Sequence, residues 1–125
     1  MRLLLDTHIF LWAVTDSPRL KAATRRLIEE AEQTFVSAAS IWEVAIKARL
    51  GKIDADPQAL ASAIVASGFA PLSVSAVHAA GVAQLEPHHN DPFDRLLVAQ
   101  ALAEPLRLVT SDEIVAQYSD LVLLV

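Results

Sequence analysis

Residues 2–14, RLLLDTHIFLWAV, place a carboxylate between two apolar runs, and this arrangement decides how the rest of the chain is interpreted. Arg2 to Leu5 is a short and almost wholly apolar run, which is typical of a strand in a parallel sheet that is buried on both faces. Residues 7–14 are predicted to form a short helix or turn. Asp6 therefore stands at the carboxyl end of a buried strand, and its presence there needs a reason.

The composition indicates one globular domain over residues 1–125. Hydrophobic residues make up 54% of the 125 residues and charged residues 20%, which excludes a disordered chain. Some of the apolar surplus is expected to cover an oligomer interface. There is no cysteine, and no run of about 18 apolar residues that would span a membrane. We therefore expect a soluble, cytoplasmic protein without disulfides.

Strands and helices are predicted to alternate along the whole chain. This pattern, β-α-β-α-α-β-α-α-β-α-β, predicts an α/β fold with a mainly parallel central sheet and helices on both faces. The predicted helix starts are Ser17, Ser40, Asp56, Ser75, Asp91 and Thr110, three of which are followed by a proline that reinforces the cap. The expected strands are 2–5, 34–37, 71–74, 107–109 and 121–125; the expected helices are 18–33, 40–50, 57–68, 75–85, 92–103 and 110–117.

Four acids, Asp6, Glu43, Asp94 and Asp112, stand out, and each also has an ordinary explanation. Asp6 could cap the following turn. Glu43 could form a capping box with Ser40 and an ion pair with Lys47, four residues later. Asp94 and Asp112 lie in the first turns of predicted helices, where a negative charge complements the helix dipole.

The joint placement of these acids favours a functional site. Asp6 and Asp112 follow strands, whereas Glu43 and Asp94 begin helices, so a parallel sheet brings all four to its carboxyl edge. Carboxylates this close repel one another unless a cation neutralises them, and Mg²⁺ or Mn²⁺ is the cation that such oxygen ligands favour. Such a site usually serves phosphate chemistry, in which the ion activates water. Without these four charges the formal net charge of −5 becomes −1, which weakens the objection that an acidic chain avoids nucleic acid.

The chain resembles the PIN-domain ribonucleases, and among them the VapC-type toxins of bacterial toxin–antitoxin pairs. The resemblance rests on LLLDTHIFLW near the start, SAASIWEVAIKARLGK in the middle, HHNDPFDRLLVAQA later and LVTSDEI near the end. It implies a three-layer PIN-like fold and a Mg²⁺- or Mn²⁺-dependent endoribonuclease. It further implies that Asp6, Glu43 and Asp94 hold the metal, that Asp112 completes the site and that Thr110 helps to orient Asp6.

Several neighbouring residues have two interpretations. Asp91 belongs to the HHNDPFDR stretch, but its place before Pro92 favours a helix cap. Lys47 and Arg95 flank two of the acids. In one interpretation both contact phosphate; in the other, Lys47 forms an ion pair with Glu43 and Arg95 is a solvated arginine in the first turn of a helix. Adjacent histidines in a polar loop, His88 and His89, are usually surface residues, with RNA contact as the looser hypothesis. His8 receives no assigned role. Trp12 and Trp42 are expected to pack in the core or at an interface, with stacking on a base as the alternative.

The resemblance also implies partners: an RNA substrate, a second copy of the chain and a cognate antitoxin. The alternative function is a non-catalytic PIN-like module that binds RNA or a protein, and the presence of all four acids disfavours it. A phosphatase with Asp6 as nucleophile is also disfavoured, because His8 stands where such a site needs a second aspartate. Neither the RNA target nor the number of metal ions can be predicted from the sequence.

Overall fold

A five-stranded sheet forms the centre of the computed structural model, which describes residues 1–125. The strands are β1 (Arg2–Leu5), β2 (Gln33–Ser37), β3 (Ala70–Leu72), β4 (Arg107–Thr110) and β5 (Val122–Leu124). Their order is β3-β2-β1-β4-β5, and every neighbouring pair is parallel. The predicted α/β architecture with a parallel sheet is therefore confirmed.

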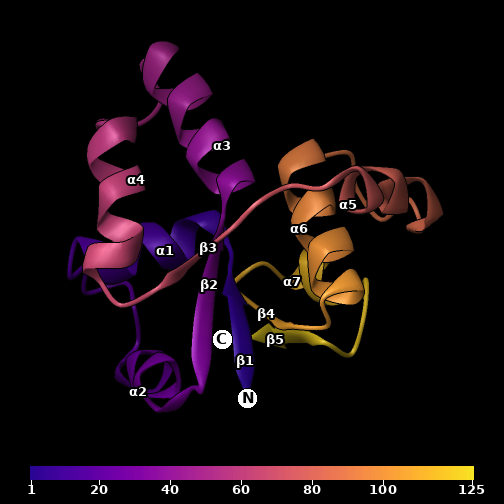
Figure 1. The fold of residues 1–125 in the computed structure, drawn as a ribbon, viewed down its shortest axis with the longest axis horizontal. Helices are drawn as coiled ribbons and strands as arrows, with labels where there is room; N and C mark the ends of the chain where they lie inside the picture. Colours follow the sequence, from indigo (N-terminus) through magenta and orange to yellow (C-terminus); the bar gives the residue numbers. More distant parts are fainter.

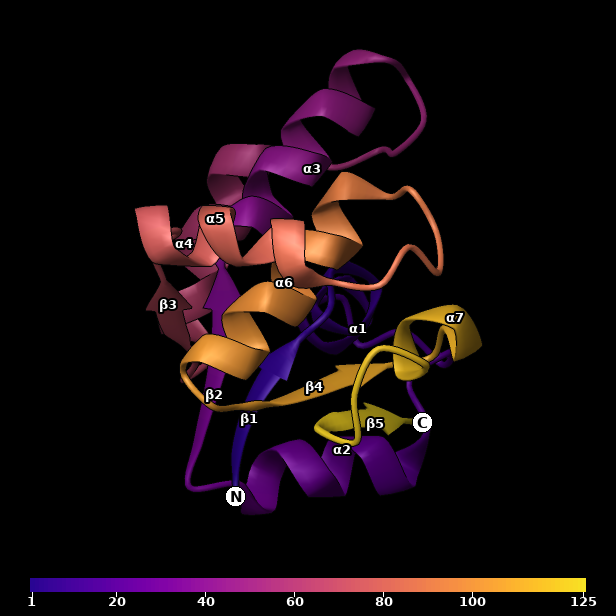
Figure 2. The same ribbon diagram turned by 90° about the vertical axis from the view of Figure 1, so that its right-hand side faces the viewer.

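Helices cover both faces of this sheet and make a three-layer fold (Figure 1, with the perpendicular view in Figure 2). Helices α1, α2 and α4 lie on one side, and α5, α6 and α7 lie on the other. Helix α3 continues directly from β2 and contributes to both cores. The bounds are α1 (Thr7–Val14), α2 (Ala22–Glu30), α3 (Ala38–Arg49), α4 (Pro57–Ala66), α5 (Ala76–Gly81), α6 (Pro92–Ala103) and α7 (Glu113–Ala116), with a 3-10 turn at Val82–Gln84.

Strand β1 shows why its sequence is apolar without alternation. Leu3 and Leu5 point into the core under α1, α2 and α4, whereas Leu4 points into the core under α6 and α7. All three side chains are fully buried. A strand in the middle of a parallel sheet needs apolar side chains on both faces, as the sequence predicted.

Three predicted helix starts are wrong, and each error has a local cause. Helix α2 begins at Ala22 rather than after Ser17, because Asp16 adopts a left-handed conformation (φ 52°) and Ser17 Oγ accepts from the amide of Arg19 within the turn. Helix α3 is capped by Ser37, so the predicted Ser40–Glu43 capping box does not form. Helix α7 is capped by Asp112 and not by Thr110, which closes β4.

The other boundaries differ from the predictions by a few residues. Strand β3 begins earlier, at Ala70, and the helix expected at 75–85 ends at Gly81 before the 3-10 turn. Two helices, α1 and α2, separate the first two strands, where the pattern allowed for one helix and a possible turn. None of the helices is long and apolar enough to cross a bilayer.

Candidate active site

Asp6 lies at the carboxyl end of β1, where the strand passes into α1. Its Oδ1 accepts from the amide of Ile9 at 2.9 Å and so caps α1, while its Oδ2 accepts from Thr110 Oγ1 at 2.5 Å. Only 6% of the residue is exposed. Burial raises the pKa of Asp6, the two hydrogen bonds oppose that change, and the charge of Glu43 adds to it. Asp6 is thus a cap and also a buried acid in the field of another acid.

Thr110 connects Asp6 to Asp112. It is fully buried at the end of β4, and its hydroxyl donates to Asp6 Oδ2 while accepting from the amide of Asp112 at 3.1 Å. The carboxylate of Asp112 is exposed and accepts from the amide of Ile114 at 2.9 Å, which caps α7. Asp112 therefore lies next to Thr110, the hydrogen-bond partner of Asp6, and its carboxylate is exposed to solvent.

Glu43 occupies the second turn of α3 and is only 4% exposed. Its Oε2 lies 2.5 Å from Lys47 Nζ, so the predicted ion pair forms, and its Oε1 lies 2.7 Å from Thr7 Oγ1. Thr7 Oγ1 also lies 3.0 Å from Ser40 Oγ. Since a hydroxyl carries one proton and a carboxylate carries none, Thr7 donates to Glu43 and Ser40 donates to Thr7. Glu43 is held by donors from α1 and α3.

Asp94 lies in the first turn of α6, directly after its cap. Asp91 Oδ1 accepts from the amides of Phe93 at 2.9 Å and Asp94 at 3.0 Å, which confirms the predicted cap at Asp91. The carboxylate of Asp94 is a quarter exposed. Burial raises the pKa of Asp94 to about 6, and the charges of Asp91, Glu43 and Asp6 act in the same direction.

Lys47 is the cation nearest to these acids. Its pKa is raised first by the hydrogen bond to Glu43, and the charges of Asp91 and Asp94 contribute as well. The ammonium group therefore sits in the combined field of three carboxylates from two helices. It offsets part of the negative charge of these carboxylates in the protein without a metal ion.

Asp6, Glu43 and Asp94 share one electrostatic environment, because the charge of each of the other two raises the pKa of Asp94. Hard oxygen donors whose charges repel one another fit a divalent cation such as Mg²⁺. Each carboxylate is nevertheless held by a protein donor, and no group of three or more His, Cys, Asp or Glu side chains is arranged so that it could hold a metal ion. The chemistry of the donors fits the ion, whereas a complete ligand set is not formed.

The loop before α6 contributes a residue that the sequence interpretation missed. His89 is not a surface residue: its Nε2 lies 3.1 Å from Asp94 Oδ2, and its Nδ1 lies 2.7 Å from Tyr118 Oη. His88 packs edge-on against the Tyr118 ring, and its Nε2 lies 3.8 Å from the exposed Glu86 and contacts none of the four candidate acids. The HHND motif identified this loop, but it did not indicate which histidine faces Asp94. No sequence signal linked Tyr118 to either histidine.

Arg95 is not the solvated arginine that the first-turn position suggested. Its guanidinium donates to Tyr118 Oη at 2.9 Å and to the carbonyl oxygens of Val82, Leu85, Glu86 and His89 at 3.0–3.4 Å. These contacts fix the segment from the 3-10 turn to His89 against α6. Arg95 therefore serves the shape of this loop.

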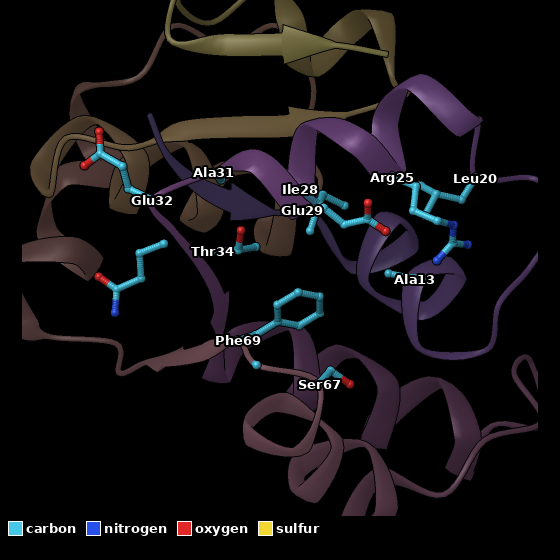
Figure 3. Close-up of a pocket in the computed structure, with 12 residues that line it drawn as sticks. Ala13, Leu20, Arg25, Ile28, Glu29, Ala31, Glu32, Thr34, Ser67 and Phe69 are labelled. Carbon is cyan, nitrogen blue, oxygen red and sulfur yellow. The ribbon is translucent and has the colours of Figure 1, made fainter.

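A cavity of about 590 Å³ lies away from the acids, at the amino ends of β2 and β3. Figure 3 shows Phe69 and Thr34 on one side of it, with Ile28, Glu29 and Arg25 of α2 on the other. None of the four acids lines this cavity. The chemistry of the acids is thus confined to the opposite, carboxyl edge of the sheet.

Comparisons with known proteins agree with this architecture. The model of the PIN domain family matches residues 3–121. Ribonuclease VapC22 from Mycobacterium tuberculosis is 36% identical over 115 residues, which cover 87% of this chain and 85% of that protein.

Two solved structures share the fold at lower sequence identity. VapBC2 from Rickettsia felis, in a crystal structure with a DNA fragment from the promoter, matches with a TM-score of 0.72 and 19% identity, over 100% of this chain and 98% of the other. A toxin–antitoxin complex from Klebsiella pneumoniae matches with a TM-score of 0.68 and 20% identity, over 97% and 95%. The family match spans nearly all of the chain, from β1 to the residue before β5, and the chain therefore belongs to the PIN-domain family, as a relative of the VapC ribonucleases.

Proposed function

We propose that the chain is a metal-dependent endoribonuclease and the toxin of a toxin–antitoxin pair. The observation that carries this proposal is the shared field of Asp6, Glu43 and Asp94, in a chain that is 36% identical to a VapC ribonuclease. In the proposed site these three acids hold Mg²⁺ or Mn²⁺, and Asp112 completes the site from the start of α7. When bound, such an ion stabilises the negative charge that develops on the phosphoryl oxygens and lowers the pKa of a bound water.

The chain's own residues have separable tasks in this proposal. Thr110 holds Oδ2 of Asp6 and thereby fixes the direction of its carboxylate. Thr7 does the same for Oε1 of Glu43 from the first turn of α1. Lys47 balances the acids before substrate arrives, and in the proposal its ammonium group, beside Glu43, contacts a phosphate of the RNA backbone.

The proposed partners are an RNA substrate, a cognate antitoxin and a second copy of the chain, all in the cytoplasm. An antitoxin is supported by the solved toxin–antitoxin complexes that share the fold. The dimer is supported by an exposed apolar stripe on α3, in which Trp42 (59% exposed), Ile46 and Leu50 (61% exposed) follow one another at four-residue spacing. Covering this stripe with a second copy would remove large apolar side chains from water.

The test is RNA cleavage by purified protein, free of antitoxin, with and without Mg²⁺. We expect Asp6→Asn to lower the cleavage rate by roughly 100-fold or more, because loss of a group that merely supports a metal ligand already costs 10–100-fold. The matched control is Asp54→Asn, an exposed aspartate before α4. Cleavage that needs no divalent ion, or that survives Asp6→Asn unchanged, would contradict the proposal.

A further inference from the structure

Tyr118 is the centre of a hydrogen-bond network that ends at Asp94. Its hydroxyl oxygen accepts from Arg95 Nη1 at 2.9 Å and from the backbone amide of His89 at 3.3 Å. Both donors have fixed protons, and together they occupy the two acceptor positions of a phenolic oxygen. The ring nitrogen His89 Nδ1, 2.7 Å away, therefore cannot donate to this oxygen as well.

The proton of the Tyr118 hydroxyl must then point at His89 Nδ1. The only competing acceptor is the carbonyl oxygen of His89 at 3.4 Å, which is a much longer contact. With Nδ1 as an acceptor, the neutral imidazole carries its hydrogen on Nε2. That nitrogen lies 3.1 Å from Asp94 Oδ2, and it donates to the carboxylate.

We propose that His89 is a positioning residue for Asp94, and that Tyr118 and Arg95 fix its tautomer and the direction of its ring. The proposal rests on the proposed role of Asp94 in the site. His89 anchors Oδ2 of the carboxylate, and Oδ1 of Asp94 accepts no hydrogen bond from the protein, so one oxygen is fixed while the other is left for the site. Supporting groups of this kind orient ligating carboxylates in metal sites.

Three separate segments meet in this network. His89 comes from the loop before α6, Asp94 and Arg95 from the first turn of α6, and Tyr118 from the segment after α7. Arg95 also lies over the Tyr118 ring, 5.7 Å from its centroid, and binds four carbonyl oxygens of the loop. The His89 side chain, only 16% exposed, is thus held from both sides and has little freedom to turn away from Asp94.

The first test is the tautomer of His89 in the metal-free protein, read from ¹⁵N chemical shifts of the imidazole ring. We expect the Nε2–H form in the wild type and a mixture of both tautomers in Tyr118→Phe, which keeps the ring and its packing but removes the hydroxyl. A wild-type His89 in the Nδ1–H form, or with both nitrogens protonated, would overturn the proposal. This measurement involves neither metal nor RNA, so it separates the network from the proposed function.

The second test is Mn²⁺ affinity, measured by calorimetry. We expect His89→Leu to weaken binding by about 10-fold, within the range for lost supporting groups, and His89→Gln to restore most of it by supplying an N–H donor at a similar reach. The control is His88→Leu, which removes the neighbouring histidine, whose acidic neighbour is the exposed Glu86 and not Asp94. Equal affinity of His89→Leu and His88→Leu would overturn the positioning role; wild-type protein that binds no Mn²⁺ would contradict the proposed function instead.

Discussion

Replacing Asp94 with asparagine should stabilise the metal-free protein at the same time as it disables the proposed site. The substitution keeps the shape of the side chain and an oxygen that can accept from His89 Nε2. It removes the negative charge that burial and the acids Asp91, Glu43 and Asp6 disfavour. The folded wild type therefore carries a cost at neutral pH that the variant does not have.

The size of this cost follows from the pKa of Asp94. A rise from 3.8 to about 6 corresponds to roughly 3 kcal/mol for the charged form, at about 1.4 kcal/mol per pKa unit. Because a quarter of the side chain faces solvent, we halve this figure and expect a gain in the free energy of unfolding of about 1.5 kcal/mol at pH 8.

The gain should depend on pH in a defined direction. The folded pKa of Asp94 lies above its unfolded value, so the folded wild type binds the proton more tightly and has its full stability from this group below about pH 3.8. That stability is lost as the pH rises through about 6. The advantage of Asp94→Asn should therefore be about half as large at pH 5 as at pH 8, and should level off above pH 7.

The assay is urea unfolding with EDTA present, at pH 5 and at pH 8, on the wild type, Asp94→Asn and the exposed control Asp54→Asn. The control should stay within about 0.5 kcal/mol of the wild type at both values of pH. An Asp94→Asn protein that is no more stable than the wild type at pH 8, or whose advantage is the same at both values, would refute the account of Asp94 as a buried and mutually repelled carboxylate.

Two further substitutions examine the donors that hold the acids. Thr110→Val keeps the branched shape but leaves Asp6 Oδ2 and the amide of Asp112 without their partner, so urea unfolding should show a loss of about 1.5–3 kcal/mol at pH 8. The loss should be smaller at pH 5, because the pKa of Asp6 rises further without the Thr110 hydroxyl and less of the carboxyl group is then charged at that pH. An equal loss at pH 5 and pH 8 would show that the hydroxyl acts only in packing. Lys47→Met removes the cation beside Glu43 and leaves the acids more negative, so Mg²⁺ should raise the melting temperature of this variant by about 4 °C more than that of the control. The control is Lys52→Met, which changes an exposed lysine beyond α3. Equal shifts in the two variants would contradict the role of Lys47 as a counter-charge.

Much of the fold could be predicted because its signals are local. The unbroken apolar run before Asp6 indicated a strand buried on both faces, and the prolines after Asp56 and Asp91 marked two helix starts correctly. The errors occurred where tertiary contacts override a local motif. Ser40 has the sequence of a helix cap, but β2 runs straight into α3, and the buried hydroxyl serves Thr7 instead.

The candidate acids could be found from the sequence, whereas the groups that hold them could not. Their common edge follows from the alternation of strands and helices, which is a property of the pattern. Their partners are specific contacts across long stretches of chain: Thr110 is 104 residues from Asp6, and Tyr118 is 29 residues from His89. No local sequence motif around these residues predicts either of the two contacts.

These donors explain how the carboxylates are tolerated in a folded, metal-free chain. Bringing like charges together at a partly buried edge costs free energy, and only donors or cations at the same place offset it. Asp6 has a hydroxyl and an amide, Glu43 has a hydroxyl and an ammonium group, and Asp94 has an imidazole. Burial nevertheless leaves the pKa of Asp6 and Asp94 raised, so the compensation is incomplete. The remaining cost is what a divalent cation in the proposed site would relieve.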